Sequence, residues 1–555
     1  MKPRSNHPGN FALLFLVISL AWPVKNLFRH PSEKVMVQSY QAAQSVPDRS
    51  TPERIRADLT AGRIDHPTAS LYLAYAFFDY SKLPRQYRSR SAWEGTLPLL
   101  ELQTTASAFP PGQIRRTIEN LLSSACNSSV GDLTGIYHSP HFHIQYGSIL
   151  AGLTLQDYIN TLETAWDAQI VRFGWAAPPV LPTNPPPGDR YHVRIDTLGG
   201  GLLGYVSSTG THAGFIGDNP STAWDEVDAY ATCMVLNNNF TGFPSSPLAA
   251  LQATTAHELN HALQYGYGAL FGENKPDNSL IEGSAIWMED EVFDDANDNY
   301  HYLWPTFSMC MGNYSNSPYP YWITLRGLVE RYGSGVPGGS EQVLQDFWEM
   351  TSQNLSGGLD ALEFALSNQG TSLADAFHAY AIAAKFNRPC GGGYVHPNCL
   401  EEGPGYVHVA GNTLPTASIS AAGGSYSGQL QDNYALNWVQ LPVTAAPYQV
   451  TLETTAGNGQ LRASVVCDTG MALVVHPLPE LVGPNSSSTL ESFTPNGCAS
   501  VVMVITNQAK TASNPTTCTP QGYILMTSPI PATLTPSPTP PAATPRPTFL
   551  PLLLR

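Results

Sequence analysis

One stretch of this 555-residue chain combines residue types and spacing suited to catalysis, Thr254–Tyr265, which reads TTAHELNHALQY. Within it, His257 and His261 are four residues apart, and side chains at that spacing lie on one face of a helix. Two imidazoles so arranged can bind one metal ion. Glu258 lies one position round the helix, where its carboxylate can take a proton from a water molecule activated by the metal. The stretch predicts a hydrolytic metal centre; the alternative is a core helix with incidental histidines.

A catalytic zinc ion takes three protein ligands and leaves the fourth position for water. The longer motif His-Glu-x-x-His-x-x-Gly-x-x-His would supply the third ligand, but Gln264 and Tyr267 occupy the positions of its Gly and last His. A glutamate from a second helix is the other source. Glu282 is the candidate, in the segment Ile281–Asp290. Glu289 lies two helical turns further on the same face, where it either orients a histidine or competes as the ligand.

These side chains need a framework that holds two helices in place. Apolar residues predict those helices at Leu251–Tyr265 and Leu280–Phe293, and a short run, Ala231–Leu236, predicts a strand before them. Upstream we expect strands at Phe142–Tyr146, Tyr191–Ile195 and Leu202–Val206, with a helix at Leu155–Phe173. Downstream we expect helices at Tyr321–Tyr332, Glu341–Thr351, Leu359–Ser367 and Leu373–Ala384. Strands followed by a helical half indicate an α+β domain.

The motif pair His257-Glu258-x-x-His261 and Glu282-Gly-x-Ala-x-Trp-x-Glu289 resembles the gluzincin zinc metallopeptidases. Within them it is similar to a group of bacterial secreted metallopeptidases whose second helix reads Glu-Gly-x-Ala-x-Trp-Met-Glu-Asp. The resemblance covers residues 140–390, approximately. It implies a zincin-like α+β catalytic domain with a β-sheet upper lobe, a helical lower lobe and one zinc ion. It implies His257, His261 and Glu282 as ligands and Glu258 as general base.

Many gluzincins also use a downstream Tyr or His to stabilise the oxyanion, and no motif identifies that residue here. Tyr319 and Tyr321, at the start of a predicted helix, are candidates; ordinary packing is the alternative for each. The chain lacks the Gly-x-Met-Glu-Asn signature of the aminopeptidases, which favours an endopeptidase. We expect the strand Ala231–Leu236 to be an edge strand that binds an extended substrate through main-chain hydrogen bonds.

Segments outside this region predict export and an accessory domain. The apolar run Phe11–Trp22 follows a basic N-terminus and is 12 residues long, whereas roughly 20 residues are needed to span a bilayer. This pattern predicts a signal peptide at residues 1–21. An uncleaved membrane anchor is the alternative. Residues 22–135 are an N-terminal helical lobe or a prosegment, and 136–405 the metallopeptidase domain. Short strands between turns predict a β-sandwich over 406–527. Residues 528–555 form a Pro/Thr-rich linker with a short apolar tail.

Composition narrows the functional class. Charged residues make up 13% of the chain and apolar residues 42%, which suits a loop-rich exported protein. The net charge of −16 reflects scarce Lys and Arg, so no basic stripe is present to bind nucleic acid. Eight cysteines fit an oxidising compartment, and Cys390 and Cys399 bracket one loop as candidate partners.

Two weaker features involve metal-binding residue types. His138, His141 and His143 resemble a second metal cluster, although a structural role is the simpler interpretation. Cys126 could cap the zinc ion as a latency thiolate, but a disulfide is favoured because the cysteine count is even.

Two further features concern the surface. Asp294, Asp295 and Asp298 could bind calcium, or form a solvated loop. Asn239 and Asn313 lie in Asn-x-Ser/Thr acceptor sites for glycosylation.

The sequence therefore predicts a secreted or cell-surface zinc endopeptidase that acts on protein or peptide substrates and has no stable membrane span. The first alternative is a catalytically inactive extracellular binding protein with the same fold, attached through its C-terminal tail. The second is a hydrolase of another class on the same zinc site.

Overall fold

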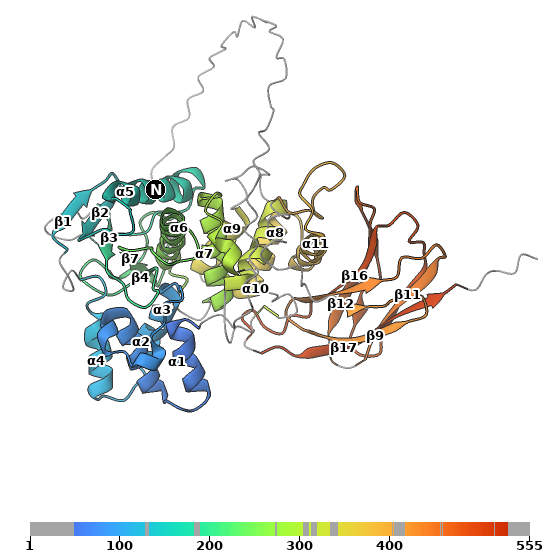
Figure 1. The fold of residues 1–555 in the computed structure, drawn as a ribbon, viewed down its shortest axis with the longest axis horizontal. Coiled ribbons are helices and arrows are strands. Elements are labelled where there is room, and N and C mark those ends of the chain that lie inside the picture. The colour runs from blue at the N-terminus through green and yellow to red at the C-terminus, as the bar shows by residue number, and fades with distance from the viewer. Residues whose placement is uncertain are drawn as a thin grey trace, which may run out of the picture. The chain divides into compact units, whose positions relative to one another are not determined.

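The computed structural model describes residues 49–530, except 128–132, 182–188, 272–274, 303–309, 312–318, 333–341, 404–416 and the single positions 354, 402, 456, 458 and 516. The predicted signal peptide and nearly all of the predicted C-terminal tail lie outside the described residues, as does Asn313. Within them, the chain has the mixed helix and strand content that the sequence predicts, with a β-rich C-terminal region (Figure 1).

A five-stranded sheet lies next to the sequence motif. Its strands are, in spatial order, β1 (Gly135–His138), β2 (Phe142–Tyr146), β3 (Tyr191–Asp196), β7 (Cys233–Asn237) and β4 (Gly204–Ser207). Strands β2, β3 and β7 run parallel, while β1 and β4 pair antiparallel at the two edges.

The expectation that Ala231–Leu236 is an edge strand is wrong. The run divides at Thr232 into β6 (Ala229–Ala231), which pairs with β5 (Gly214–Gly217), and β7. All five residues of β7 are buried, because β3 and β4 flank the strand and its two faces are both covered. Strand β4 is therefore the outermost strand at this end of the sheet.

One face of the sheet shares an apolar core with three helices, the last two of which carry the motif pair. These are α5 (Leu155–Trp166), continued by a π-helical turn (Asp167–Arg172), then α6 (Pro247–Gly266) and α7 (Asn278–Val292). Ser246 caps α6 by accepting a hydrogen bond from the Ala249 N–H, and Pro247 fits the first turn of that helix. Further helices extend the same core: α8 (Trp322–Tyr332), α9 (Gln342–Ser352), α10 (Gly358–Asn368) and α11 (Leu373–Phe386). Of the helices described, none has both the length and the apolar character needed to cross a membrane.

The opposite face of the sheet is covered by an N-terminal helical lobe. Its helices are α1 (Thr51–Thr60), α2 (His66–Phe78), α3 (Thr96–Ala106) and α4 (Gln113–Leu122). Leu202, Tyr205 and Val235 contribute to the core of this lobe, whereas Met234 of the same strand β7 faces the other core. The lobe therefore packs directly on the sheet.

A disulfide also joins this lobe to the sheet. Cys126 is bonded to Cys233 of β7, so the alternative in which Cys126 is a free latency thiol is wrong. Cys390 is bonded to Cys399 as the loop spacing suggests, and the remaining four cysteines form the pairs Cys310–Cys518 and Cys467–Cys498. No cysteine of the chain is free.

The β-rich C-terminal region consists of two sheets that share one apolar core. The first contains β13 (Leu473–Pro477), β12 (Gln460–Asp468), β16 (Ser500–Asn507), β10 (Ala435–Leu441) and β8 (Ala417–Ser418), with β14 (Leu481–Val482) paired to β12. The second contains β15 (Ser487–Phe493), β11 (Tyr448–Thr454), β17 (Pro520–Pro529) and β9 (Ser425–Gln431). Val465 and Met503 of the first sheet belong to the same buried cluster as Tyr448 and Leu525 of the second.

Helix α11 packs against the outer face of the first of these sheets. The Trp438 indole N–H donates to the carbonyl of Ala381 at 2.9 Å. The imidazole of His378 lies between two hydroxyls, with Nδ1 2.9 Å from Thr506 Oγ1 and Nε2 2.9 Å from Ser464 Oγ. Burial lowers the pKa of His378 to about 3, so this contact contains a neutral imidazole near pH 7.

The neutral state of His378 predicts a specific acid sensitivity. The pKa of His378 is about 3 in the folded chain, against an ordinary value of 6.5. The contribution of the neutral imidazole to the free energy of unfolding is therefore fully present above pH 6.5 and is lost as the pH falls toward 3. We expect His378→Gln to remove this contribution, so that the wild-type chain loses about 3 kcal/mol more than the variant between pH 8 and pH 4. Urea unfolding at the two pH values measures the difference, and the pH 8 value accounts for packing lost in the variant. Parallel pH profiles would contradict this role of His378.

Candidate metal centre

Helices α6 and α7 bring His257, His261 and Glu282 together. The two Nε2 atoms lie 3.0 Å apart, and Glu282 Oε2 lies 3.2 Å from His257 Nε2 and 3.6 Å from His261 Nε2. All three side chains are completely buried. One potential ligand atom from each residue therefore lies within 4.8 Å of the other two.

The second nitrogen of each imidazole is held by a separate partner. His257 Nδ1 lies 2.7 Å from Glu289 Oε1, and His261 Nδ1 lies 2.8 Å from Gln264 Oε1. The Gln264 amide is oriented because its Nε2 donates to oxygens of the residues Asn260, Ile281 and Ser284. Both partners therefore accept an Nδ1 hydrogen, which leaves each Nε2 lone pair directed at the common point.

Glu289 and Gln264 thus have defined places beside the imidazoles. Of the two roles considered for Glu289, its position is that of a residue that orients His257, while Glu282 is the carboxylate beside both Nε2 atoms. Gln264, whose presence breaks the longer three-histidine motif, instead orients His261 and links α6 to α7.

The donor set fits a divalent cation. Neither carboxylate oxygen of Glu282 accepts a well-aligned hydrogen bond, and Oε1 of Glu258 is also buried without one. Two Nε2 lone pairs 3.0 Å apart repel each other unless a proton or a cation lies between them. Nitrogen and carboxylate oxygen donors are the set that zinc prefers in catalytic sites. His257, His261 and Glu282 are therefore the residues that could hold the ion.

The pKa values of these groups follow from burial and from one another. Burial alone would raise the pKa of Glu282, but the imidazoles of His261 and His257 outweigh it and hold the pKa at about 2. Burial raises the pKa of Glu289 to about 7 in spite of its hydrogen bond to His257. Burial lowers the pKa of His257, yet the neighbouring carboxylates of Glu282 and Glu289 raise it well above the ordinary value. The site thus favours positive charge between its carboxylates.

Glu258 lies beside this group and is completely buried. Its Oε2 accepts a hydrogen bond of 2.5 Å from Thr96 Oγ1, at the start of α3. Burial raises its pKa, and the imidazoles of His261 and His257 partly offset the effect. A buried carboxylate with a raised pKa beside a metal site suits a group that exchanges protons.

Sequence reasoning missed a second carboxylate at the site. Glu94 belongs to a short stretch, Trp93–Thr96, which we call the inserted segment. A carboxylate oxygen of Glu94 lies within 4.8 Å of ligand atoms of both His257 and Glu258, and its Oε2 is buried without a partner. Burial raises the pKa of Glu94 well above the ordinary value, and Glu258 acts in the same direction. No motif or spacing relates Glu94 to the histidines, which lie more than 150 residues away, so its proximity arises from folding alone.

The two tyrosines predicted to stabilise an oxyanion have different surroundings. Tyr321 is directed elsewhere, because its hydroxyl donates to the carbonyl of Cys310 at 2.6 Å. Burial raises the pKa of Tyr319 well above the ordinary value, and the next cause is the charge of Glu282. The ring of Tyr319 also lies 5.0 Å, centroid to centroid, from that of Tyr302, which the sequence did not single out. Burial raises the pKa of Tyr302 as well, and the charges of Glu94 and Glu289 act in the same direction.

The three histidines of the strand region do not form one cluster. His141 pairs with Glu163 at 2.7 Å, whereas His143 Nδ1 lies 2.9 Å from His138 Nε2. Two histidines that the sequence did not group with them lie near His143: the rings of His143 and His192 are stacked at 5.3 Å, and those of His192 and His212 at 3.9 Å. Stacked rings do not direct their nitrogens at one point, and this set is not among the convergent ligand groups of the described residues.

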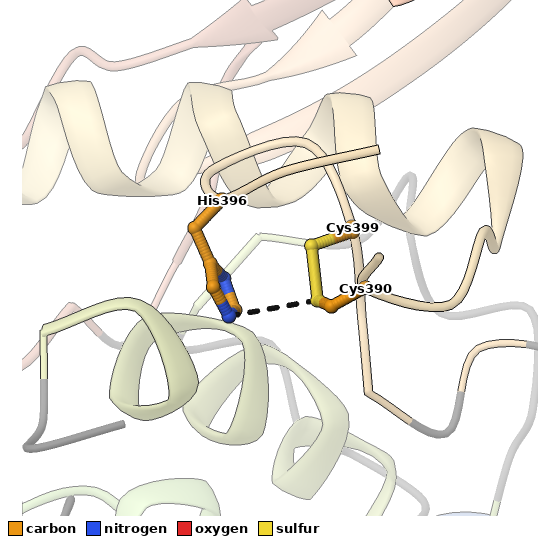
Figure 2. Close-up of side chains that lie close together, drawn as sticks. All are labelled: Cys390, His396 and Cys399. Carbon is orange, nitrogen blue, oxygen red and sulfur yellow. Dashed lines mark hydrogen bonds between the residues drawn. A yellow bond between two sulfur atoms is a disulfide. The ribbon is translucent and has the colours of Figure 1, made fainter. Parts of the chain in front are cut away.

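A third group of potential metal ligands, Cys390, His396 and Cys399, contains a disulfide. His396 Nε2 lies 3.5 Å from Cys390 Sγ, and Figure 2 shows that this sulfur is bonded to Cys399. Disulfide sulfurs are not thiolate ligands, so this loop is no metal site in the oxidised chain.

The acidic residues considered for calcium also remain apart from any ligand group. Asp294 and Asp295 are exposed, and Asp298 Oδ1 accepts a hydrogen bond from Ser245 Oγ. No convergent set among the described residues includes them.

Comparison of the chain with models of known protein families and with curated proteins finds no match.

The arrangement predicts how zinc binding depends on Gln264. We expect about one zinc ion per chain, measured by elemental mass spectrometry, and expect Gln264→Met to lower zinc affinity about 10–100-fold because His261 loses its Nδ1 acceptor. Competition with a chromogenic chelator measures the affinity. Gln113→Met, an exposed glutamine on α4, is the matched control and should leave it unchanged. Equal affinities in the two variants would contradict the orienting role of Gln264.

Proposed function

We propose that the protein is a zinc-dependent endopeptidase of the gluzincin type, with a zincin-like catalytic domain. The observation that carries the proposal is the meeting of His257, His261 and Glu282 at one buried point beside Glu258. The sequence resemblance assigns these same residues to metal binding and general-base catalysis, and the buried geometry supports that assignment. A zinc ion held there would supply a Lewis acid and lower the pKa of water toward about 7.

The remaining steps are carried by side chains of the chain itself. Glu258 takes the proton of the attacking water and passes it to the amine leaving group, and its raised pKa helps it to act first as a base and then as an acid. Glu289 and Gln264 keep the imidazoles in the orientation that exposes Nε2. Tyr319 is the better candidate for stabilising the oxyanion, because Tyr321 donates its hydroxyl to a main-chain carbonyl.

The proposed substrate is an extended segment of a protein or peptide. Strand β4 replaces the expected strand as the surface for main-chain pairing, because it is the sheet edge next to α6. The approach is close: a Cβ added at Gly204 would lie 3.3 Å from Glu258 Cγ and 2.9 Å from Thr254 Cγ2. A peptide along β4 would therefore run past the general base.

Export is part of the same proposal. Pairing of all eight cysteines supports an oxidising compartment, which agrees with the signal peptide expected at residues 1–21. Secretion and retention at the cell surface both remain compatible with this chemistry, and the β-rich region is proposed as an accessory domain.

The test is Glu258→Gln. We expect this variant to bind zinc as the wild type does but to cleave a denatured protein substrate about 10²–10⁴-fold more slowly, because the proton acceptor is lost. Mass spectrometry of the digest measures cleavage, and Glu119→Gln, an exposed glutamate of α4, is the control. Equal cleavage by Glu258→Gln and the wild type would remove Glu258 from this role. If the chain binds zinc but neither the wild type nor any variant, Gly95→Ala and Glu94→Gln included, cleaves the substrate, the result would favour a binding protein or a hydrolase of another class.

A further inference from the structure

The inserted segment lies along the outer edge of β4. The Trp93 N–H donates to the carbonyl of Gly201 at 3.0 Å, and the Leu203 N–H donates to the carbonyl of Trp93 at 3.1 Å. The Gly95 N–H donates to the carbonyl of Gly204 at 2.9 Å. The main-chain groups that an incoming strand would use are therefore already paired within the chain.

The loop before β4 is shaped to receive this part of the chain. Gly200 and Gly201 have φ angles of +64° and +77°, which favour glycine. A Cβ at Gly200 would lie 2.3 Å from the ring of Tyr80, and one at Gly201 would lie 2.2 Å from the carbonyl oxygen of Ser91. The Trp93 indole N–H donates to the carbonyl of Gly200 at 2.8 Å. The loop therefore holds the segment through side-chain and main-chain contacts.

Gly95 is required by the closeness of the approach. Its φ of −100° is open to any residue, but an added Cβ would lie 2.7 Å from the carbonyl oxygen of Gly204 and 2.8 Å from Leu202 Cδ1. The obstacle at Gly204 is main chain, which cannot turn aside as a flexible side chain would. Even a methyl group at position 95 would therefore push the segment away from β4.

The side chains of the segment reach the candidate metal centre. Thr96 Oγ1 accepts a hydrogen bond from the Val206 N–H at 2.7 Å and donates one to Glu258. Glu94, only 2% exposed, directs its carboxylate to within 4.8 Å of ligand atoms of His257 and Glu258. A buried carboxylate with an unpartnered oxygen is costly unless a cation is near it. The segment thus occupies both the strand edge and the neighbourhood of the reacting groups.

We propose that the inserted segment is a tethered occupant of the substrate position, with Glu94 directed at the metal centre, and that it must leave β4 before a substrate binds. This inference rests on the proposed peptidase function. An extended peptide would need the same Leu203 N–H, Gly204 carbonyl and Val206 N–H that the segment now engages. The peptide and the segment therefore exclude each other.

Release of the segment is local. The lobe that carries it shares an apolar core with Leu202, Tyr205 and Val235 of the sheet and is bonded to β7 through Cys126–Cys233. In the proposed release these contacts would hold α3 and α4 on the sheet, while Trp93–Gly95 and the first residue of α3, Thr96, detach and the Trp93 ring leaves the same apolar core.

Two variants and a matched control test the proposal in the full chain. Gly95→Ala forces the segment from β4, Glu94→Gln replaces the carboxylate at the centre with an amide, and Gly112→Ala changes a glycine of the same lobe whose added Cβ would meet nothing closer than 3.8 Å. The first readout is the rate at which EDTA removes zinc from each purified protein. We expect zinc removal to be about tenfold faster in Gly95→Ala and Glu94→Gln and unchanged in Gly112→Ala. The reason is that the state in which the inserted segment has left β4 becomes more populated in the first two variants. The second readout is cleavage of a denatured protein, expected to rise in Gly95→Ala.

The outcomes separate this inference from the proposed function. Faster zinc removal in the segment variants supports the occupant even if no protein substrate is cleaved, in which case the peptidase proposal fails alone. If EDTA removes zinc equally fast from the wild type and from folded, zinc-loaded Glu94→Gln, the inserted segment does not occupy the substrate position, whatever the result for Gly95→Ala. Circular dichroism checks that each variant is folded, and elemental analysis checks its zinc content.

Discussion

The structure depends on the electrostatic cost of burying two imidazoles and several carboxylates at one point. His257, His261, Glu258 and Glu282 have no exposed surface, and the two Nε2 atoms are 3.0 Å apart. Ionised carboxylates taken out of water must be paired or must bind cations. In this site each imidazole has a partner on its outer nitrogen, so the compensating positive charge has to come from a proton or a metal ion in the middle. Helices α6 and α7 must then lie face to face to hold that point.

The rest of the fold keeps those two helices in position. The sheet supplies a rigid apolar surface beneath α6, and the alternation along β7 divides its side chains between the helical core and the N-terminal lobe. Gln264 adds a polar link through its contacts with the Ile281 carbonyl and Ser284. Because these contacts engage the N–H donors of the Gln264 amide, they fix a spacing between α6 and α7 that apolar packing alone would leave adjustable.

The N-terminal lobe takes part in the site as well as in the fold. Its core continues onto the sheet, and the segment that leads into α3 brings Glu94 and Thr96 next to Glu258. The lobe, for which the sequence left open a removable prosegment, thus makes two kinds of contact. It packs on the sheet through apolar side chains, and it places the polar side chains of Glu94 and Thr96 at the candidate metal centre. These two kinds of contact have different consequences, because an apolar interface resists separation while a short edge-strand pairing can open locally.

The sequence by itself determined the local parts of this protein. Spacing of four places His257 and His261 on one helix face, and the apolar patterns located α6, α7 and strands such as β2 and β3 closely, because helix and strand periods are properties of neighbouring residues. The acidic second helix identified Glu282 and Glu289, and its periodicity put them on one face. The even cysteine count predicted disulfide pairing, and Cys390 and Cys399 are close enough in sequence for their pairing to be anticipated.

Only the tertiary structure decided which distant groups meet. The pairing Cys126–Cys233, the interior position of β7 and the approach of Glu94 to Glu258 depend on strand order, which local patterns do not encode. Tyr321 was a candidate on sequence position, yet its hydroxyl is used by the Cys310 carbonyl. Gln264 interrupts the three-histidine motif in the sequence, and only the packing of α6 against α7 places its amide between the two helices. Periodicity specifies the face on which a residue lies, whereas its partner is selected by packing between elements far apart in the chain.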